Sequence, residues 1–281
     1  MTVTWDDGNL PSLPKLGALG WLRVLLRGLP LLSVLIVVLI IHTIVRLIEQ
    51  YFAGSSRPVS AAIVQWVCVV ALRILGLTLR LHGDVMTAPG AVVANHSSWL
   101  DIFVLNARKR IFFVAKSEVR GWPGIGWLAR AAGTVFIKRD RKEAHAQVEL
   151  FRQRLGHGHR LLFFPEGTST DNQRVLPFKT TLFAPFFDDS LRNIAHIQAV
   201  SVVYHAPAGQ DDRFYGWWGE MSFGRHLLTV LGARGNGSVD VVCHPPHKLS
   251  EYTDRKSLAA DLERCVRQGF ETHQKGCLKA R

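Results

Sequence analysis

A histidine and a carboxylate stand close together in the sequence, His96 and Asp101. One apolar run, residues 91–94, precedes the histidine, and a second, residues 102–105, follows the carboxylate. This pattern predicts a strand-to-helix corner, with His96 in the turn, Ser98 at the start of the helix and Asp101 in its first turn. An imidazole held by a carboxylate can take a proton from a substrate, so the pair could form a general base.

The same residues also have a purely structural interpretation. Ser98 and Asp101 have the spacing of a helix capping box, and an acidic residue in the first turn stabilises a helix. In that interpretation His96 is an ordinary loop histidine. The local sequence fits both interpretations, so the rest of the chain has to distinguish them.

A second polar corner follows the apolar run at residues 161–164. Here Glu166 and Gly167 are followed by three hydroxyl residues, 168–170. A carboxylate and several hydroxyls at the end of a strand are typical of a substrate site. The structural alternative is a glycine turn whose polar residues cap the next segment.

A third candidate follows the β-branched run at residues 134–137, where cations gather over residues 138–142. Arg139 could bind a phosphate through its planar guanidinium. A solvated basic face at the start of the next helix is the alternative, and we prefer it for Lys138, Arg141 and Lys142.

The composition points to a membrane. Of the 281 residues, 48% are hydrophobic and 20% charged, and the net charge of +12 favours an anionic partner. Residues 29–41 are almost entirely aliphatic, and a shorter apolar run spans 59–72. We expect a loose arm over residues 1–14, then a two-helix membrane hairpin over 15–75. A cleaved signal peptide ending near residues 53–55 is the alternative.

Residues 76–281 have the alternating pattern of an α/β domain. Helical periodicity is clearest over residues 142–155 and from Thr253 onward. An aromatic-rich insertion over residues 205–237 suits either an interface or a cover for the core. The predicted strands span residues 77–81, 92–94, 111–115, 134–137, 161–164, 197–204 and 239–243.

Three motifs in order resemble the glycerolipid acyltransferase family, which includes the 1-acylglycerol-3-phosphate acyltransferases. They are His96-x-x-x-x-Asp101, the strand leading to Arg139, and the corner at residues 164–168. The resemblance implies a mixed central sheet flanked by helices, of the glycerol-3-phosphate acyltransferase type, behind the membrane hairpin. It also implies a membrane-bound O-acyltransferase that moves a fatty acyl group from acyl-CoA or acyl-carrier protein to a lysolipid, giving phosphatidic acid from 1-acylglycerol-3-phosphate.

The resemblance also assigns roles to residues. It makes His96 the general base and Asp101 its orienting partner, and it gives Arg139 the acceptor's anionic head group. Lys116 matches a further recurring segment of the family. Backbone N–H groups near Ser97 and Ser98 are the expected oxyanion donors. The acceptor pocket is assigned to Glu166, Gly167 and Thr168.

Two departures bear on the acceptor. Family members that make phosphatidic acid often have Arg after Glu-Gly-Thr, where this chain has Ser169, and often have Pro near Val200, where it has Ala199. A head-group cation is therefore missing. The run of residues 164–178 resembles the lyso-ornithine lipid acyltransferases at least as closely, which makes a lyso-ornithine lipid the alternative acceptor.

Other functional classes fit the sequence less well. Residues 167–171 nearly match the nucleophile elbow of serine hydrolases, but Asp171 replaces the last glycine. A basic membrane-surface binding protein is the non-enzymatic alternative, whereas the aliphatic segment argues against nucleic acid. The His and Cys spacings match no zinc site, so we expect neither a metal nor a cofactor. We expect the enzyme at the cytoplasmic face of the inner membrane.

Overall fold

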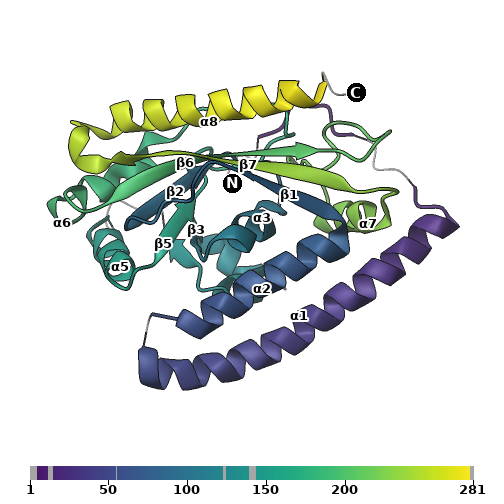
Figure 1. The fold of residues 1–281 in the computed structure, drawn as a ribbon, viewed down its shortest axis with the longest axis horizontal. Coiled ribbons are helices and arrows are strands. Elements are labelled where there is room, and N and C mark those ends of the chain that lie inside the picture. The colour runs from purple at the N-terminus through teal and green to yellow at the C-terminus, as the bar shows by residue number, and fades with distance from the viewer. Residues whose placement is uncertain (1–4, 12–14, 55, 123–124, 139–143, 279–281) are drawn as a thin grey trace.

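The computed structural model describes residues 5–11, 15–54, 56–122, 125–138 and 144–278, with the side chains of the last helix up to residue 274. Two long helices come first, and strands and helices then alternate (Figure 1). The helices are α1 (Ala18–Ala53), α2 (Pro58–Leu75), α3 (Asp101–Arg108), α4 (Ile125–Ala131), α5 (Ala144–Gly156), α6 (Asp189–Arg192), α7 (Phe223–Gly232) and α8 (Arg255–Leu278), with the short 3-10 helices η1 (Ser117–Gly121), η3 (Thr180–Phe187) and η4 (Leu249–Glu251). The strands are β1 (Leu77–His82), β2 (Gly90–Ala94), β3 (Phe112–Lys116), β4 (Val135–Ile137), β5 (Arg160–Phe163), β6 (His196–His205) and β7 (Gly237–Lys248).

These strands form one seven-stranded sheet in the order β1-β7-β6-β2-β5-β3-β4. The five adjacent strands β6, β2, β5, β3 and β4 are parallel to one another. Strand β7 is antiparallel to β6, and β1 is parallel to β7. The mixed α/β fold implied by the resemblance is therefore confirmed. Because β2, β5, β3 and β4 are parallel, the segments that follow them leave the sheet at a common edge.

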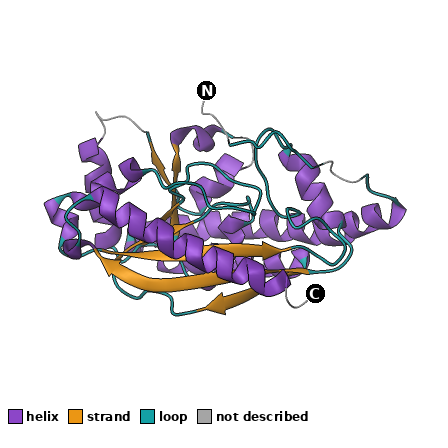
Figure 2. Cartoon of the chain, turned by 90° about the horizontal axis from the view of Figure 1, so that it is seen from above, coloured by secondary structure: helices purple, strands orange, loops and turns teal. Residues whose placement is uncertain are grey.

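Successive residues of the central strands point to opposite faces and build two separate cores. On one face, Val92 and Ala94 of β2 pack with α1, α2 and α3. On the other face, Ala91 and Val93 pack with α5 and α8. Figure 1 shows α1 and α2 below the sheet and α8 above it, and Figure 2 shows α8 lying along the strands. Burial on both faces explains why these strands are continuous apolar runs in the sequence.

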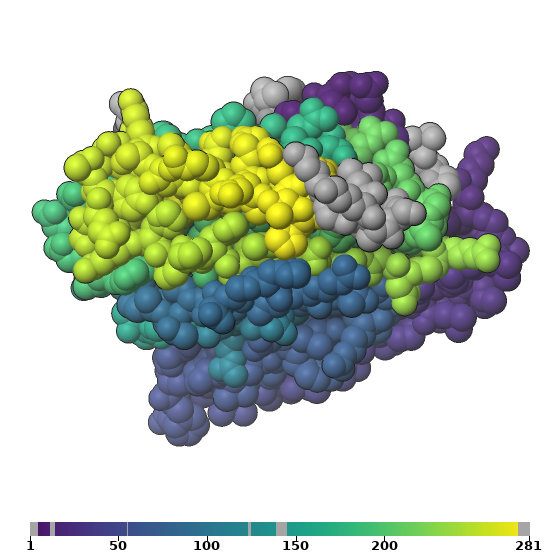
Figure 3. Space-filling view, turned by 45° about the horizontal axis from the view of Figure 1, so that its top comes forward, coloured from purple at the N-terminus to yellow at the C-terminus, as the bar shows by residue number. Residues whose placement is uncertain are grey.

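The N-terminal hairpin consists of α1 and α2, which are both long and apolar enough to cross a membrane, with mean hydropathy of 2.8 and 1.9 over their best windows. Helix α1 packs against α2 and α7, yet most of its large aliphatic side chains stay exposed. The hairpin lies along the lower side of the molecule in Figure 3, away from α8. An apolar surface of this extent is suited to lipid.

The junction between hairpin and sheet is a single residue. Helix α2 ends at Leu75, the N–H of its C-cap Gly76 donates to the carbonyl groups of Arg73 and Leu72, and β1 begins at Leu77. The Gly76 φ is 68°, and a Cβ there would lie 2.4 Å from Asn236 Oδ1. The tight turn therefore requires glycine.

The aromatic-rich insertion covers the core. Tyr215 and Trp218 are buried, and α7 packs against α1. His226 of α7 is buried as well, and its Nδ1 lies 2.9 Å from the indole Nε1 of Trp99. Of the two interpretations of this segment, the structure supports the cover for the core.

Candidate active site

Two asparagine side chains bind the edge of β6 beside the His96 corner. Asn95 directly follows β2, and its amide accepts from Val202 N at 2.7 Å and donates to Val202 O at 2.8 Å. Asn172, at φ 61°, makes the same pair with Tyr204 N at 3.1 Å and Tyr204 O at 2.9 Å. Each side-chain amide bonds both the N–H and the C=O of one β6 residue, as the backbone of a neighbouring strand would. Each Asn therefore holds its loop against the sheet. Neither residue was predicted from the sequence; an Asn directly after a buried strand was the available signal for Asn95.

The His96 imidazole contacts the Asp101 carboxylate, with Nδ1 2.7 Å from Oδ2. Because Nδ1 is bound to a carboxylate, the proton of a neutral imidazole lies on Nδ1 and the lone pair on Nε2. The imidazole stacks on Phe164, with ring centroids 4.1 Å apart, and the His96 side chain is 22% exposed. The ring is thus held in one orientation while part of it still faces solvent.

Asp101 is fully buried and accepts four hydrogen bonds. Besides His96, its Oδ2 accepts from Ser97 N at 3.0 Å and Ser98 N at 3.1 Å. Its Oδ1 accepts from the Tyr204 hydroxyl at 2.6 Å. Burial, followed by the nearby Asp101, raises the pKa of Tyr204, so this hydroxyl stays protonated and donates. Tyr204 was not singled out in the sequence, because it reaches this corner from a distant strand.

These contacts correct two expectations about the corner. Helix α3 begins at Asp101 and not at Ser98, because residues 99–100 form a turn. The N–H groups of Ser97 and Ser98, expected to stabilise an oxyanion, both donate to Asp101. The N-cap of α3 is Leu100, which makes no side-chain capping bond, and the Ser98 hydroxyl accepts from Leu100 N at 3.3 Å. Asp101 therefore binds His96, and the prediction of a capping box that starts at Ser98 is wrong.

Glu166 links two loops by accepting a backbone hydrogen bond from each of them. Its Oε1 accepts from His96 N and its Oε2 from Leu176 N, both at 2.7 Å, and the residue is 1% exposed. The next residue, Gly167, has φ 73°, which favours glycine at this turn. Burial raises the pKa of Glu166 to about 8, although the two N–H donors and Arg267 oppose the shift. Glu166 thus acts on the site by positioning the His96 backbone.

The raised pKa of Glu166 predicts a pH-dependent stability. An unfolded glutamic acid ionises near 4.5, so between this value and about 8 the folded protein retains a proton that the unfolded chain has released. The free energy of unfolding should therefore fall as pH rises across this range. Replacing Glu166 with Gln removes the titration, and we expect thermal midpoints of the variant between pH 5 and 8.5 to depend less on pH.

The Glu166→Gln variant should also unfold more readily at pH 5, because its amide NH₂ group would face a backbone N–H. A matched control is Glu149→Gln, since Glu149 lies on the surface beside Arg152 and Gln153 and its pKa is lowered to about 2, outside the range measured. This control should keep the pH profile of the parent. Parallel profiles for the parent and Glu166→Gln would contradict the prediction.

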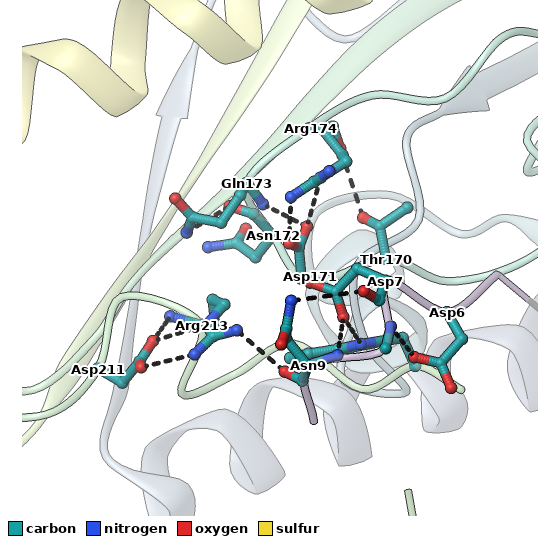
Figure 4. Close-up of polar contacts among 12 residues, drawn as sticks. Asp6, Asp7, Asn9, Thr170, Asp171, Asn172, Gln173, Arg174, Asp211 and Arg213 are labelled. Atoms are coloured by element: carbon teal, nitrogen blue, oxygen red, sulfur yellow. Dashed lines mark hydrogen bonds and ion pairs between the residues drawn. The ribbon is translucent and has the colours of Figure 1, made fainter. Parts of the chain in front are cut away.

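The described part of the N-terminal arm lies against the Glu-Gly-Thr corner. Trp5 N donates to Thr168 Oγ1 at 3.2 Å, and Trp5 O accepts from Gly219 N at 3.1 Å. The Arg174 guanidinium lies 5.0 Å from the centre of a Trp5 ring. Figure 4 shows the arm beside the segment that follows the corner. These residues are therefore docked, although their composition alone suggested a loose segment.

Of the other two predicted site residues, the structure describes Lys116, which belongs to a strand near the β4 side of the sheet. Lys116 ends β3 and is the register partner of Ile137, which ends β4. Because β3 is parallel to β5, and β5 to β2, Lys116 lies on the side of the sheet at which the carboxyl ends of β2 and β5 also lie. Arg139 falls outside the described residues. In the described part of the chain, no group of three His, Cys, Asp or Glu side chains could hold a metal ion.

Comparison with known proteins gives consistent matches. The family model described as Acyltransferase matches residues 78–190. A lyso-ornithine lipid O-acyltransferase of Rhodobacter capsulatus is 53% identical over 248 residues, which are 88% of this chain and 90% of that protein. A 1-acyl-sn-glycerol-3-phosphate acyltransferase of Neisseria gonorrhoeae is 37% identical over 143 residues, 50% of this chain and 54% of that one.

The crystal structure of the 1-acyl-sn-glycerophosphate (LPA) acyltransferase PlsC from Thermotoga maritima has a similar fold. The TM-score is 0.64 and the identity 21%, with 93% of this chain and 98% of that chain covered. At this identity the similarity is a likeness of fold.

Proposed function

This chain belongs to the acyltransferase family, and we propose that it moves a fatty acyl group from an acyl thioester to the free hydroxyl of a lyso-ornithine lipid. The main support for this acceptor is the 53% identity, over nearly the full length of both chains, with the lyso-ornithine lipid O-acyltransferase of Rhodobacter capsulatus. Ser169, in the place where a phosphate-binding Arg is frequent, agrees with this choice. Family membership also disfavours the serine hydrolase and the purely membrane-binding protein.

In the proposed reaction, His96 acts as the general base through Nε2. It removes the proton of the acceptor hydroxyl while that oxygen attacks the thioester carbonyl carbon and forms the new C–O bond. Collapse of the tetrahedral intermediate breaks the C–S bond, and the imidazolium returns the proton to the departing thiolate. The Asp101 carboxylate, 2.7 Å from Nδ1, stabilises the imidazolium between these steps.

The remaining predicted residues support this reaction from the edge of the sheet. Glu166 and Gly167 shape the acceptor pocket by fixing the backbone of the His96 corner, and Thr168 binds the arm that borders it. Lys116 and Arg139 are proposed to bind anionic groups of the substrates. Acyl-CoA and acyl-carrier protein are the proposed donors, which places the domain on the cytoplasmic side of the inner membrane with the hairpin in the bilayer.

The acceptor is tested by offering lyso-ornithine lipid and lysophosphatidic acid in separate and mixed assays, with acyl-CoA and acyl-carrier protein as donors. We expect kcat/KM for lyso-ornithine lipid to exceed that for lysophosphatidic acid by about tenfold or more, since a phosphate without its cation is left poorly bound. Product formation is followed by mass spectrometry of the lipid extract.

Lysophosphatidic acid is the second candidate acceptor, and the 37% identity with the Neisseria gonorrhoeae enzyme favours it. If only lysophosphatidic acid is acylated, then it is the acceptor and the proposal of a lyso-ornithine lipid is wrong. Transfer to neither lipid, from either donor, would contradict the proposed function itself.

A further inference from the structure

A groove of about 640 Å³ lies between the C-terminal half of α1 and helix α4, beside the turn that joins α1 to α2. Its walls come from elements that contribute none of the residues around His96. The residues that matter for its chemistry are His42, Arg46, Arg57, Trp127 and Arg130. Aliphatic side chains of α1 complete the lining.

The apolar wall of the groove is exposed. Ile40 and Leu47 of α1 are 57% and 68% exposed, and Trp127 of α4 is 67% exposed. Side chains this apolar at the surface of the candidate membrane helix α1 are suited to contact with hydrocarbon chains. Indole rings in addition favour the boundary between hydrocarbon and head groups. The groove therefore combines a hydrocarbon surface with an interfacial aromatic ring.

The groove also carries an excess of positive charge, from the same two helices and the turn between α1 and α2. Arg46, Arg57 and Arg130 line the groove, and among the described residues no lining side chain is acidic. Glu49 is 3.5 Å from Arg46, but its Oε1 already accepts from Val59 N and Ser60 N at the start of α2. The single negative charge of Glu49 does not balance three guanidinium groups.

The pKa of Arg57 reflects the burial of its side chain first and this excess of cations second. Its side chain is partly buried, with Nη1 3.2 Å from Ala131 O. Burial, and then the neighbouring cations Arg46 and Arg154, lower the pKa of Arg57 to about 10. A cation whose charged form is disfavoured by its neighbours gains from an anion placed among them.

His42 supplies an independent indication of a ligand. The residue is only 5% exposed and lines the groove, and its Nε2 has no hydrogen-bond partner among the described residues. A buried polar atom without a partner is costly and is rare in folded proteins. Nε2 itself is not accessible from the groove in this structure, so a turn of the His42 ring would bring it to a ligand oxygen and give it the missing partner.

We propose that the groove binds an anionic membrane phospholipid, with its phosphate among Arg46, Arg57, Arg130 and His42 and its acyl chain along α1. Guanidinium groups bind phosphate through charge-assisted, often bidentate hydrogen bonds. The ligand chemistry is therefore a phosphodiester attached to a hydrocarbon chain. This lipid is bound and not acylated, so the inference does not depend on the acceptor chosen above.

The test uses the full-length protein, delipidated in a neutral detergent, and native mass spectrometry. Dioleoylphosphatidylglycerol and dioleoylphosphatidylcholine are titrated separately, because they share acyl chains and differ in net charge. We expect one molecule of phosphatidylglycerol to bind to each protein, with a higher affinity than phosphatidylcholine. In the double variant Arg46→Gln, Arg130→Gln its affinity should fall by about 30-fold, the effect of removing two cations close to a phosphate.

Two further variants separate binding from folding. Arg255→Gln with Lys256→Gln removes two exposed cations at the start of α8, on the opposite face of the sheet, and should retain the parent affinity. His42→Leu removes the unpartnered nitrogen and should weaken phosphatidylglycerol binding while leaving phosphatidylcholine unaffected. Should the double variant fail to fold, the exposed Arg130→Gln alone carries the test.

Several outcomes would overturn the proposal. These are equal binding of the two lipids, unchanged phosphatidylglycerol affinity in the Arg130 and His42 variants, or equal loss in the α8 control. Displacement of the lipid by glycerol 3-phosphate at an equal concentration would show that the groove binds a soluble anion. Acyl transfer is measured in parallel, so loss of lipid binding with turnover retained separates this site from the catalytic one.

Discussion

Replacing His96 with Ala should lower turnover by about 10²–10⁴-fold, the usual contribution of a positioned general base. The acceptor hydroxyl is a weak nucleophile at neutral pH, and Nε2 of His96 is the nitrogen left to take its proton once Nδ1 is bound to Asp101. Purified enzyme is assayed at saturating lysolipid and donor, so that the measured change is in kcat. We expect KM for both substrates to change far less.

The matched control for this variant is His157→Ala. His157 is exposed, and its Nδ1 lies 2.6 Å from the Gln153 carbonyl oxygen within α5 and the turn that follows it. This control should retain parent turnover. Both variants should stay in the membrane fraction and unfold near the parent temperature, because the His96 side chain is only partly buried. Near-normal turnover of His96→Ala would remove His96 from the mechanism.

Replacing Asp101 with Asn should lower turnover by about 100-fold or more while preserving the fold. An asparagine oxygen in the Oδ2 position still accepts from His96, Ser97 and Ser98, and its NH₂ group can donate to a rotated Tyr204 hydroxyl. What disappears is the negative charge that stabilises the imidazolium. The readouts are kcat and the thermal midpoint.

Two companion variants separate charge from scaffolding. Asp101→Ala should lose activity and also unfold at a markedly lower temperature, because each buried donor left without an acceptor costs about 1–3 kcal/mol. Tyr204→Phe removes a single donor to Oδ1 and should reduce turnover much less than Asp101→Asn. An Asp101→Asn enzyme with parent activity would show that Asp101 is only a structural residue.

The sequence was sufficient to predict the parts of the site that depend on local spacing. His96 and Asp101 are joined by one short turn, so their contact follows from a strand-to-helix corner. The central strands could be predicted because burial on both faces makes them short apolar runs bounded by polar residues. Because β2 and β5 are parallel, the corners that follow them lie on the same side of the sheet.

The contacts that complete the site could not be predicted, because they join residues far apart in the chain. Tyr204 binds Asp101 from β6, and Glu166 binds the backbone of His96 and Leu176. Local spacing indicates which residues are polar but not whether a polar side chain meets a substrate or a backbone N–H. For Glu166 the structure shows two backbone donors, so the part proposed for it in an acceptor pocket is indirect.

The single-residue junction at Gly76 also bears on how a lipid acceptor reaches His96. Because β1 begins immediately after α2, and because α2 packs against α3 and α1 against α7, no linker separates the hairpin from the sheet. With the hairpin in the bilayer, the height of His96 above the hydrocarbon is set by the architecture and does not vary with linker motion. The length of acyl chain that a lysolipid must withdraw from the bilayer to react is therefore a constant of the enzyme, and lengthening the chain at Gly76 would change it.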